Sequence, residues 1–381
     1  MAMTMLRCHG LLHRPLHSWL HSLLHTLFHT LFLTETMLDT KTNHDAGRAE
    51  TDSVIANDER APNEQPVRVV APAAIHLPSG ARAPVYVSDA WHRPEQSAHI
   101  TTALIVIHGR LRNADVYYDS AERAVLAAGR SLDDTLLVVP QFLAEADIDA
   151  HGLSADTLAW DWTGWMGGDV AMRPAPISSF AVIDAIIDQL ADATRFPALT
   201  QLVVVGHSGG GQVVHRYAVV AQGTPGMPGM QARDMHTRYV IANPSSYVYF
   251  DEDRPQADGH FAPFDRQQCA HFDHWKYGPR HAPAYIGARA FDDLERAYVA
   301  RDVRYLWGER DCSPTHPALD ISCAAQAQGP DRLSRGLAYF RYLQQRHGVS
   351  LAHQGAIVPG VGHDGDGMLT SSEGVAALFG Q

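Results

Sequence analysis

The chain has 381 residues, of which 45% are hydrophobic and 19% charged, a composition typical of a globular protein with a sizeable core. The formal charge at pH 7 is −12, so we expect no nucleic-acid partner, because a phosphate-binding face needs clustered lysine and arginine. No uninterrupted apolar stretch reaches about 18 residues, so no membrane-spanning helix is expected. The length allows two ordinary domains or one large α/β domain.

Residues 1–66 differ from the rest of the sequence. Histidine recurs at every fourth position from His9 to His29, mostly separated by Leu, Ser, Thr and Phe. Histidines with this spacing on a helix could bind a metal, and a signal peptide is a second interpretation because Arg7 precedes a leucine-rich stretch. We favour a low-complexity extension followed by a flexible polar lead-in, with Met37 as an alternative start.

From residue 67 the pattern is that of an α/β domain extending to residue 381. Residues 67–77 and 84–87 predict an antiparallel hairpin. Short apolar runs then alternate with helical stretches, which indicates a mostly parallel sheet with helices on both sides. The predicted strands are 103–107, 135–139, 202–205, 239–242, 303–307 and 356–358, and the predicted helices are 114–128, 178–191, 210–221, 291–300, 332–346 and 367–379. In the helix 332–346 we expect leucine and aromatic residues on the buried face and arginines on the other.

Two irregular segments interrupt this alternation. Residues 247–290 are rich in Pro, His, Asp and aromatics, and they form either a lid or a plain surface excursion. The stretch 158–176 carries Trp160, Trp162 and Trp165 beside several glycines. These tryptophans either line a substrate pocket or seal the edge of the core.

The strongest chemical signal is Gly206-His207-Ser208-Gly209-Gly210, which follows the strand 202–205 and leads into a helix. A Gly-x-Ser-x-Gly turn in this context predicts a nucleophile elbow, in which a sharp turn raises the serine above the sheet. Small residues are needed on both sides because the backbones pass closely. We expect His207 to pack against the site or shape its pocket.

A second signal follows the strand 103–107, where His108-Gly109-Arg110 comes directly after the apolar run. In a serine hydrolase this loop supplies one backbone donor of the oxyanion hole. We therefore expect the amides of Arg110 and Gly209 to converge on one oxyanion, and His108 to lie near the substrate pocket.

A serine nucleophile needs a base, and the base needs an orienting acid. Asp311 follows the strand 303–307, with Glu309 and Asp302 as rivals at the same strand. His363 follows the last strand on a glycine-rich loop, and the chain order Ser208, Asp311, His363 distinguishes it from the other 22 of the 23 histidines. His353 is expected at the surface.

With these motifs the chain resembles the α/β-hydrolase superfamily, in its esterase–lipase branch, over residues 67–381. The segment from His108 to Asp115 is also similar to the oxyanion loop of polyhydroxyalkanoate-depolymerase and feruloyl-esterase relatives. The resemblance implies a mostly parallel eight-stranded sheet flanked by helices, in which the segment 247–290 is either a lid insertion or a surface excursion. It also implies a Ser–His–Asp mechanism without metal or organic cofactor, and the serine at position 208 disfavours the dehalogenase and epoxide-hydrolase branches.

Cys312 and Cys323 flank a short loop after Asp311, and a disulfide between them would imply an oxidising compartment. Two reduced thiols are the alternative, and Cys8 and Cys269 have no evident partner. We expect a cytoplasmic protein, with secretion or a periplasmic location as the alternative. The sequence does not indicate an oligomeric state.

The sequence thus predicts a serine hydrolase that cleaves carboxylic esters, small or polymeric, through an acyl-enzyme intermediate. An amidase, peptidase or thioesterase would use the same residues. A non-catalytic binding protein that retains the fold is the rival from another class. The presence of a candidate nucleophile, base and acid disfavours that rival, because a binding protein needs none of them.

Overall fold

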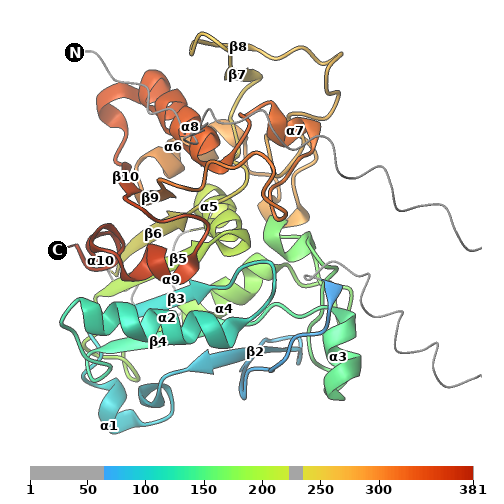
Figure 1. Ribbon diagram of the computed structural model, residues 1–381. Helices are drawn as coiled ribbons and strands as arrows, with labels where there is room; N and C mark the ends of the chain where they lie inside the picture. Colours follow the sequence, from blue (N-terminus) through green and yellow to red (C-terminus); the bar gives the residue numbers. More distant parts are fainter. Residues whose placement is uncertain (1–63, 223–234, 381) are drawn as a thin grey trace, which may run out of the picture. The chain divides into compact units, whose positions relative to one another are not determined.

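An eight-stranded sheet forms the centre of the part of the chain that the computed structural model describes, residues 64–222 and 235–380 (Figure 1). Across the sheet the strand order is β1-β2-β4-β3-β5-β6-β9-β10. The bounds are β1 Ala73–His76, β2 Arg82–Val87, β3 Thr102–Ile107, β4 Thr135–Pro140, β5 Gln201–His207, β6 His236–Ala242, β9 Asp302–Gly308 and β10 Gln354–Val358. The prediction for the histidine-rich stretch lies outside the described residues.

The pairing of the strands confirms the predicted sheet. β1 pairs antiparallel with β2, and β2 pairs antiparallel with β4. All other neighbours in the sheet, from β4 through β3, β5, β6 and β9 to β10, are parallel. The carboxyl ends of these parallel strands therefore meet along one edge, where ligands of open α/β sheets bind.

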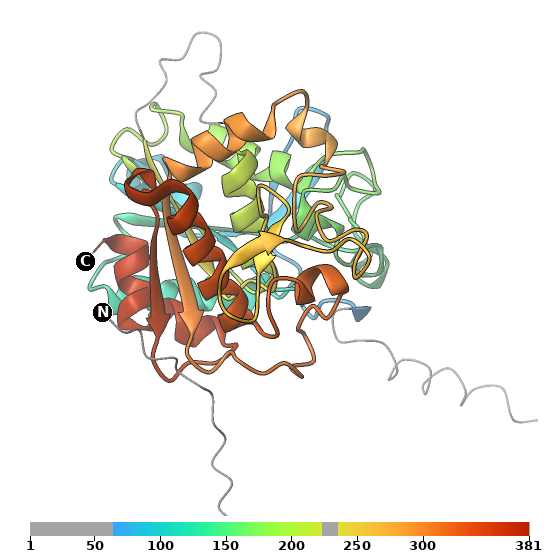
Figure 2. The same ribbon diagram turned by 90° about the horizontal axis from the view of Figure 1, so that it is seen from above.

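Helices cover both faces of the sheet, as Figures 1 and 2 show. The longer helices are α2 Ala114–Ala127, α4 Ser179–Leu190, α5 Gly209–Val220, α6 Phe291–Val299, α8 Arg332–His347 and α10 Ser372–Phe379. The short helices α1 Pro94–Ser97, α3 Glu145–His151 and α7 Cys323–Gln326 were not predicted. The helix predicted at 367–379 is two helices, α9 Gly365–Thr370 and α10, because Ser371 is extended and its side chain caps α10.

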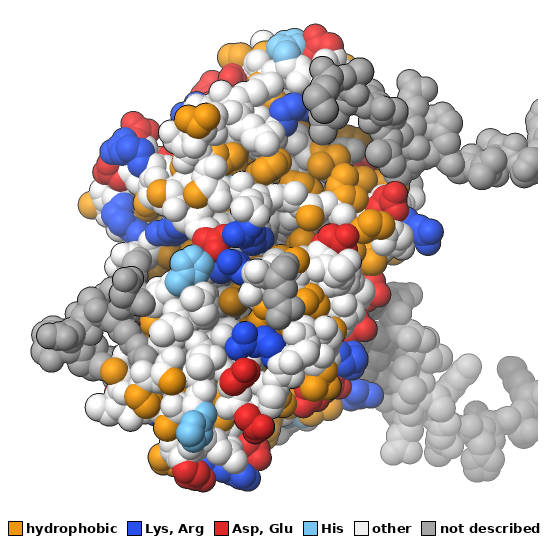
Figure 3. Space-filling model, turned by 90° about the vertical axis from the view of Figure 1, so that its left-hand side faces the viewer, with side chains coloured by type: hydrophobic (Ala, Val, Ile, Leu, Met, Phe, Trp, Pro, Cys, Tyr) orange, Lys and Arg blue, Asp and Glu red, His pale blue; other side chains and the backbone are white. Residues whose placement is uncertain are grey.

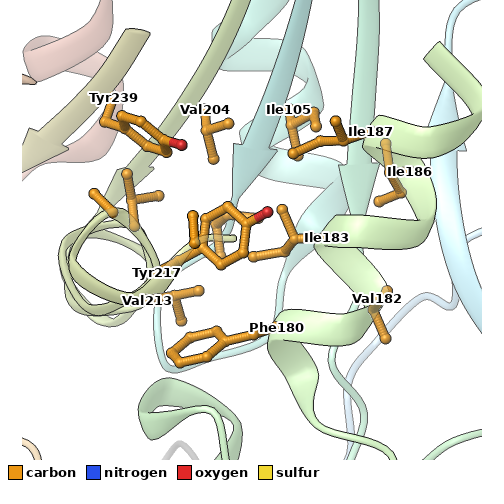
Figure 4. Close-up of a cluster of buried hydrophobic side chains, with 14 of the residues drawn as sticks. Ile105, Phe180, Val182, Ile183, Ile186, Ile187, Val204, Val213, Tyr217 and Tyr239 are labelled. Carbon is orange, nitrogen blue, oxygen red and sulfur yellow. The ribbon is translucent and has the colours of Figure 1, made fainter. Parts of the chain in front are cut away.

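The strands form where apolar residues are continuous because both faces of the sheet are covered. All six residues of β3 are buried, and alternate ones enter two separate clusters: Ala103, Ile105 and Ile107 on one face, Leu104 and Val106 on the other. Figure 4 shows the first cluster between the sheet and helices α4 and α5. Its labelled members are Ile105, Phe180, Val182, Ile183, Ile186, Ile187, Val204, Val213, Tyr217 and Tyr239.

The buried face of α8 differs from the prediction. Arg332 and Arg335 are 1% and 0% exposed, whereas Leu337 is 37% exposed. Tyr339, Tyr342 and Leu343 also lie on the buried side. Amphipathicity alone predicts the wrong buried face for this helix. Both arginines donate hydrogen bonds to acceptors inside the fold, which compensates the cost of their desolvation.

Part of the segment 247–290 belongs to the core. Its first residues, from Tyr247 to Phe250, are buried, and a two-stranded hairpin of β7 Asp253–Pro255 and β8 Phe261–Pro263 follows. Cys269 forms a disulfide with Cys323. Both alternatives for Cys312 and Cys323, a bond between them and two reduced thiols, are therefore wrong, and so is the absence of a partner for Cys269. Partners 54 positions apart cannot be identified from spacing.

Within the described residues, no helix has the length and apolar character needed to cross a bilayer. On the face of the molecule in Figure 3, basic and acidic side chains are intermixed with hydrophobic ones. The expectation that nucleic acid is not a partner stays a prediction.

A buried ion pair fixes the loop that leads from β3 into α2. Arg112 Nε donates to Asp147 Oδ2 at 2.8 Å, and Arg112 Nη2 donates to Asp147 Oδ1 at 3.0 Å. The Asp147 carboxylate also accepts the backbone N–H groups of Val67 and Ala144. Four donors thus satisfy one carboxylate that is fully buried.

Replacing Asp147 with alanine should lower the free energy of unfolding by about 3–5 kcal/mol, because a buried guanidinium loses its counter-charge. Chemical denaturation measures this loss. Asp149→Ala, at an exposed position of the same helix, is the matched control and should change stability by less than about 0.5 kcal/mol. A comparable effect of both variants would contradict the role of the buried pair.

Candidate active site

Ser208 occupies the turn between β5 and α5. Its φ and ψ angles are 59° and −117°, a conformation that non-glycine residues adopt only under constraint. The Ser208 N–H donates to the Ala242 carbonyl at 3.0 Å, and the Gln212 N–H donates to the Ser208 carbonyl at 3.0 Å. These bonds tie the turn to strand β6 on one side and to helix α5 on the other.

The glycines around Ser208 are required by close backbone approaches. A Cβ atom on Gly206 would lie 2.3 Å from the carbonyl carbon of Gly210. One on Gly210 would lie 2.0 Å from the Ile107 carbonyl oxygen, and one on Gly211 would lie 2.5 Å from the Ala242 carbonyl oxygen. Contacts this short cannot exist, so only glycine allows α5 to begin directly against the neighbouring strands.

Three side chains from separate strand ends form one chain of hydrogen bonds at the carboxyl edge of the sheet. Ser208 Oγ lies 2.9 Å from His363 Nε2, and His363 Nδ1 lies 2.7 Å from Asp311 Oδ2. Ser208 follows β5, Asp311 follows β9, and His363 lies between β10 and α9. The parallel sheet thus brings together residues 52 and 155 positions apart in the sequence.

The rival acids are engaged elsewhere. Glu309 accepts the backbone N–H of Gly360 at 2.7 Å, and Asp302 pairs with Arg238 and Arg304. Of the three acidic residues considered at β9, the structure brings Asp311 to His363.

Asp311 is a carboxylate at neutral pH. Burial alone would raise the pKa of Asp311, but the hydrogen bonds and positive charges of His363 and Arg332 outweigh it and hold this pKa below its ordinary value. An ionised Asp311 accepts the proton on His363 Nδ1. His363 Nε2 is then left as the acceptor for the Ser208 hydroxyl proton.

The backbones of Gly209 and Arg110 lie side by side next to Ser208. A Cβ atom on Gly209 would be 3.0 Å from the Arg110 backbone nitrogen. Gly209 is the first residue of α5, so its N–H has no acceptor within the helix. This arrangement places two backbone amides beside the serine.

A cleft of about 520 Å³ opens over Ser208 and His363. Its walls come from the loop after β3, the first part of α2, the segment 316–318 and the start of α9. Leu111 and Val116 are exposed apolar residues at this cleft. The lining residues are Gly109, Arg110, Leu111, Asn113, Val116, Tyr117, Ser120, Arg123, His207, Ser208, His316, Pro317, Ala318, His363, Asp364, Gly365 and Asp366.

Two further imidazoles flank His363. The ring centroids of His207 and His316 lie 4.7 Å and 5.0 Å from that of His363. Burial, then the charges of His363 and Arg332, hold the pKa of His207 well below its usual value. Desolvation, then the charges of Arg332 and His363, also lower the pKa of His316, so both rings are neutral near pH 7.

His207 lines the cleft as expected, and Tyr117 Oη lies 3.0 Å from its Nδ1. His316 Nδ1 accepts the Ala318 N–H at 3.1 Å, which leaves Nε2 as the protonated nitrogen of the neutral ring. The sequence analysis missed Tyr117 and His316. Tyr117 sits on an ordinary amphipathic helix and His316 on an irregular loop, so neither carries a motif that identifies it.

The other predicted pocket residues are not among those that line this cleft. His108 is fully buried: the Phe142 N–H donates to its Nε2 at 2.9 Å, and burial lowers its pKa to about 4. Trp160 and Trp165 pack in the core around Phe142. Trp162 is half-buried, with the Arg112 guanidinium over its ring. The tryptophan-bearing stretch therefore seals the core beside the cleft instead of lining it.

His353 is also buried, so its expected surface position is wrong. Its Nε2 lies 2.8 Å from the Tyr298 carbonyl oxygen, and its Nδ1 lies 3.3 Å from the Tyr305 hydroxyl oxygen. Burial lowers the pKa of His353 to about 4. Among the described residues, one group has the residue types of a metal site: Cys269, His271 and Cys323. Its two sulfurs are joined in the disulfide, which removes both thiolate ligands.

No protein-family model matches the chain, and a search of curated proteins found no match. Among solved structures, it is similar to poly(aspartic acid) hydrolase-1 from Sphingomonas sp. KT-1, with 22% identity, a TM-score of 0.52, and coverage of 80% of this chain and 96% of that one. It is also similar to LpqC, a poly(3-hydroxybutyrate) depolymerase from Bordetella parapertussis, with 21% identity, a TM-score of 0.52, and coverage of 80% and 85%. These likenesses establish the fold, and the predicted α/β-hydrolase fold is confirmed.

Replacing Gly210 with alanine should lower the free energy of unfolding by at least about 3 kcal/mol or prevent folding, because its Cβ would overlap backbone atoms of β3 and its loop. Gly362→Ala is the matched control in the same region. Its Cβ would have no neighbour closer than 3.9 Å, so this variant should fold normally. A folded Gly210→Ala protein with unchanged thermal stability would contradict the close packing of the turn.

Proposed function

We propose that the protein is a serine hydrolase of carboxylic esters, with Ser208 as nucleophile, His363 as general base and Asp311 as orienting acid. The observation that carries this proposal is the continuous hydrogen-bonded chain of 2.9 Å and 2.7 Å from Ser208 Oγ through His363 to a buried carboxylate. The cleft above the serine gives a carbonyl carbon access to the hydroxyl. A binding protein has no need for these three groups in this geometry.

The proposed reaction has two stages, acylation and deacylation of Ser208, and His363 transfers the proton in both. Ser208 Oγ attacks the ester carbonyl while His363 Nε2 accepts its proton, and Asp311 stabilises the imidazolium that forms. His363 then donates this proton to the departing alcohol, which leaves an acyl group on Ser208. A water molecule that His363 deprotonates hydrolyses the acyl-enzyme and restores the hydroxyl.

The negative charge of the tetrahedral intermediate needs donors on the side of Ser208 away from His363. The backbone amides of Gly209 and Arg110 are the proposed donors, because their chain segments are in contact beside the serine. The N-terminus of α5 adds the positive end of the helix dipole at the same place. Backbone donors are already oriented before reaction, so they cost no reorganisation in the transition state.

The cleft suits an acyl or alkyl group of moderate size, because its volume is about 520 Å³ and its outer wall carries Leu111 and Val116. The segment 247–290 contributes no residue to the described lining of this cleft, so a lid from that segment stays a prediction. Amides and thioesters are the alternative substrates. The two similar structures are described as a poly(aspartic acid) hydrolase and a poly(3-hydroxybutyrate) depolymerase, so a substrate panel should include both polymers beside small esters.

Ser208→Ala should lower the hydrolysis rate of p-nitrophenyl esters by at least about 10,000-fold, because the attacking oxygen is removed. The measurement is initial rate with acyl chains of increasing length, from acetate upward. The mutant should keep the wild-type thermal stability. Equal rates for the two proteins would show that hydrolysis occurs elsewhere, and no turnover of esters, amides or thioesters by the wild-type chain would favour the binding-protein alternative.

Asp311→Asn should lower kcat about 10,000-fold, because an amide cannot hold His363 in the tautomer that accepts the serine proton. Glu309→Gln is the matched control at the same strand end, and it should retain activity because Glu309 contacts only a loop amide. A larger loss in Glu309→Gln than in Asp311→Asn would reassign the acid.

A further inference from the structure

A buried arginine occupies the side of Asp311 that His363 leaves free. Arg332 begins α8, and its Nη1 donates to Asp311 Oδ1 at 3.1 Å. His363 meets the other carboxylate oxygen, Oδ2, at 2.7 Å. Asp311 thus lies between two donors, one on each oxygen, and the side chains of Arg332 and Asp311 are only 1% and 2% exposed.

Rigid elements fix this arrangement. Arg332 Nε donates to Ser245 Oγ at 2.9 Å, and Ser245 in turn accepts Arg335 Nη1 at its carbonyl, at 2.7 Å. The Leu333 N–H donates to the Asp311 carbonyl at 3.2 Å, which joins the first turn of α8 to the acid loop. Neither Asp311 nor Arg332 can rotate without breaking hydrogen bonds in a buried region.

The charge of Arg332 also bears on the proposed reaction. Burial lowers the pKa of Arg332 and Asp311 opposes this, so the guanidinium stays protonated at neutral pH. Before reaction, Arg332 and Asp311 form a neutral pair. The charge and the hydrogen bond of Arg332 are among the causes that hold the pKa of Asp311 below its ordinary value. Arg332 therefore helps to keep ionised the carboxylate that accepts the proton on His363 Nδ1.

The remaining groups that face His363 have a weaker electrostatic influence. His207, His316 and Tyr117 are uncharged near neutrality, because burial lowers the pKa of both imidazoles and raises that of the phenol. Arg110 and Asp364, at the cleft, carry charges of opposite sign and lie at least partly in solvent, which screens them. Arg332 and Asp311 are the buried charges of this constellation.

We infer that Arg332 is a positioning residue of the active site: it holds Asp311 through Oδ1 in the orientation that His363 requires, and its charge favours the ionised form of Asp311. The inference rests on the proposed function, because it assigns Arg332 a role in the same triad.

The experiment measures kcat and KM separately for ester hydrolysis. In Arg332→Gln the donor on Asp311 Oδ1 is lost, so kcat should fall about tenfold or more. KM should change little, because Arg332 is not among the residues that line the cleft. In Arg332→Lys the charge remains but the two-pronged contact to Asp311 and Ser245 is lost, so kcat should fall here as well.

Two further variants separate these effects from damage to α8. Ser245→Ala removes the acceptor of Arg332 Nε and should lower kcat while KM changes little. Arg335→Gln removes a buried arginine of the same helix that donates to the carbonyls of Gly329 and Ser245, so its kcat should fall less than that of Arg332→Gln. Thermal unfolding of each variant reports whether it is folded.

Wild-type kcat in both Arg332→Gln and Arg332→Lys would overturn the positioning role. A loss of kcat in Arg335→Gln as large as in Arg332→Gln would overturn the assignment to this arginine. If Arg332→Gln does not fold, Arg332→Lys and Ser245→Ala decide. Wild-type protein that hydrolyses no ester would instead refute the proposed function, which keeps the two failures distinct.

Discussion

The hydrogen bond between His363 Nδ1 and the buried Asp311 carboxylate is the interaction on which the site depends. It fixes the tautomer of the imidazole, and the tautomer determines whether Nε2 can accept the serine proton. The bond exists because β9 and β10 are parallel neighbours whose carboxyl ends meet at one edge of the sheet. The fold contributes to the site mainly by bringing these strand ends together.

The second constraint is the close packing under Ser208. The serine stands at a strained backbone position because β5, α5 and the neighbouring strands approach within van der Waals contact at three glycines. This packing leaves the first amide of α5 without a helical acceptor and places it against the loop that follows β3. The same contacts that raise Ser208, the proposed nucleophile, also bring together the proposed oxyanion donors.

Much of the fold could be predicted from sequence because its signals are local. Continuous apolar runs mark strands covered on both faces, and Gly206-His207-Ser208-Gly209-Gly210 carries its own backbone requirement. The failures are non-local. A buried Arg332 is stable only because a carboxylate 21 positions earlier receives it, and Cys269 finds its partner 54 positions away. Helical periodicity contains no information about either partner, so it predicts that the arginine is exposed.

The role of Ser208 is tested most directly by the residue that an activated-serine reagent modifies. Wild-type protein would be treated with a fluorophosphonate, digested and mapped by mass spectrometry. We expect a single adduct on the peptide that contains Ser208, formed in the wild type and lost in His363→Ala, because labelling needs the base and not merely a cleft. An adduct on another residue, or equal labelling without His363, would contradict this role.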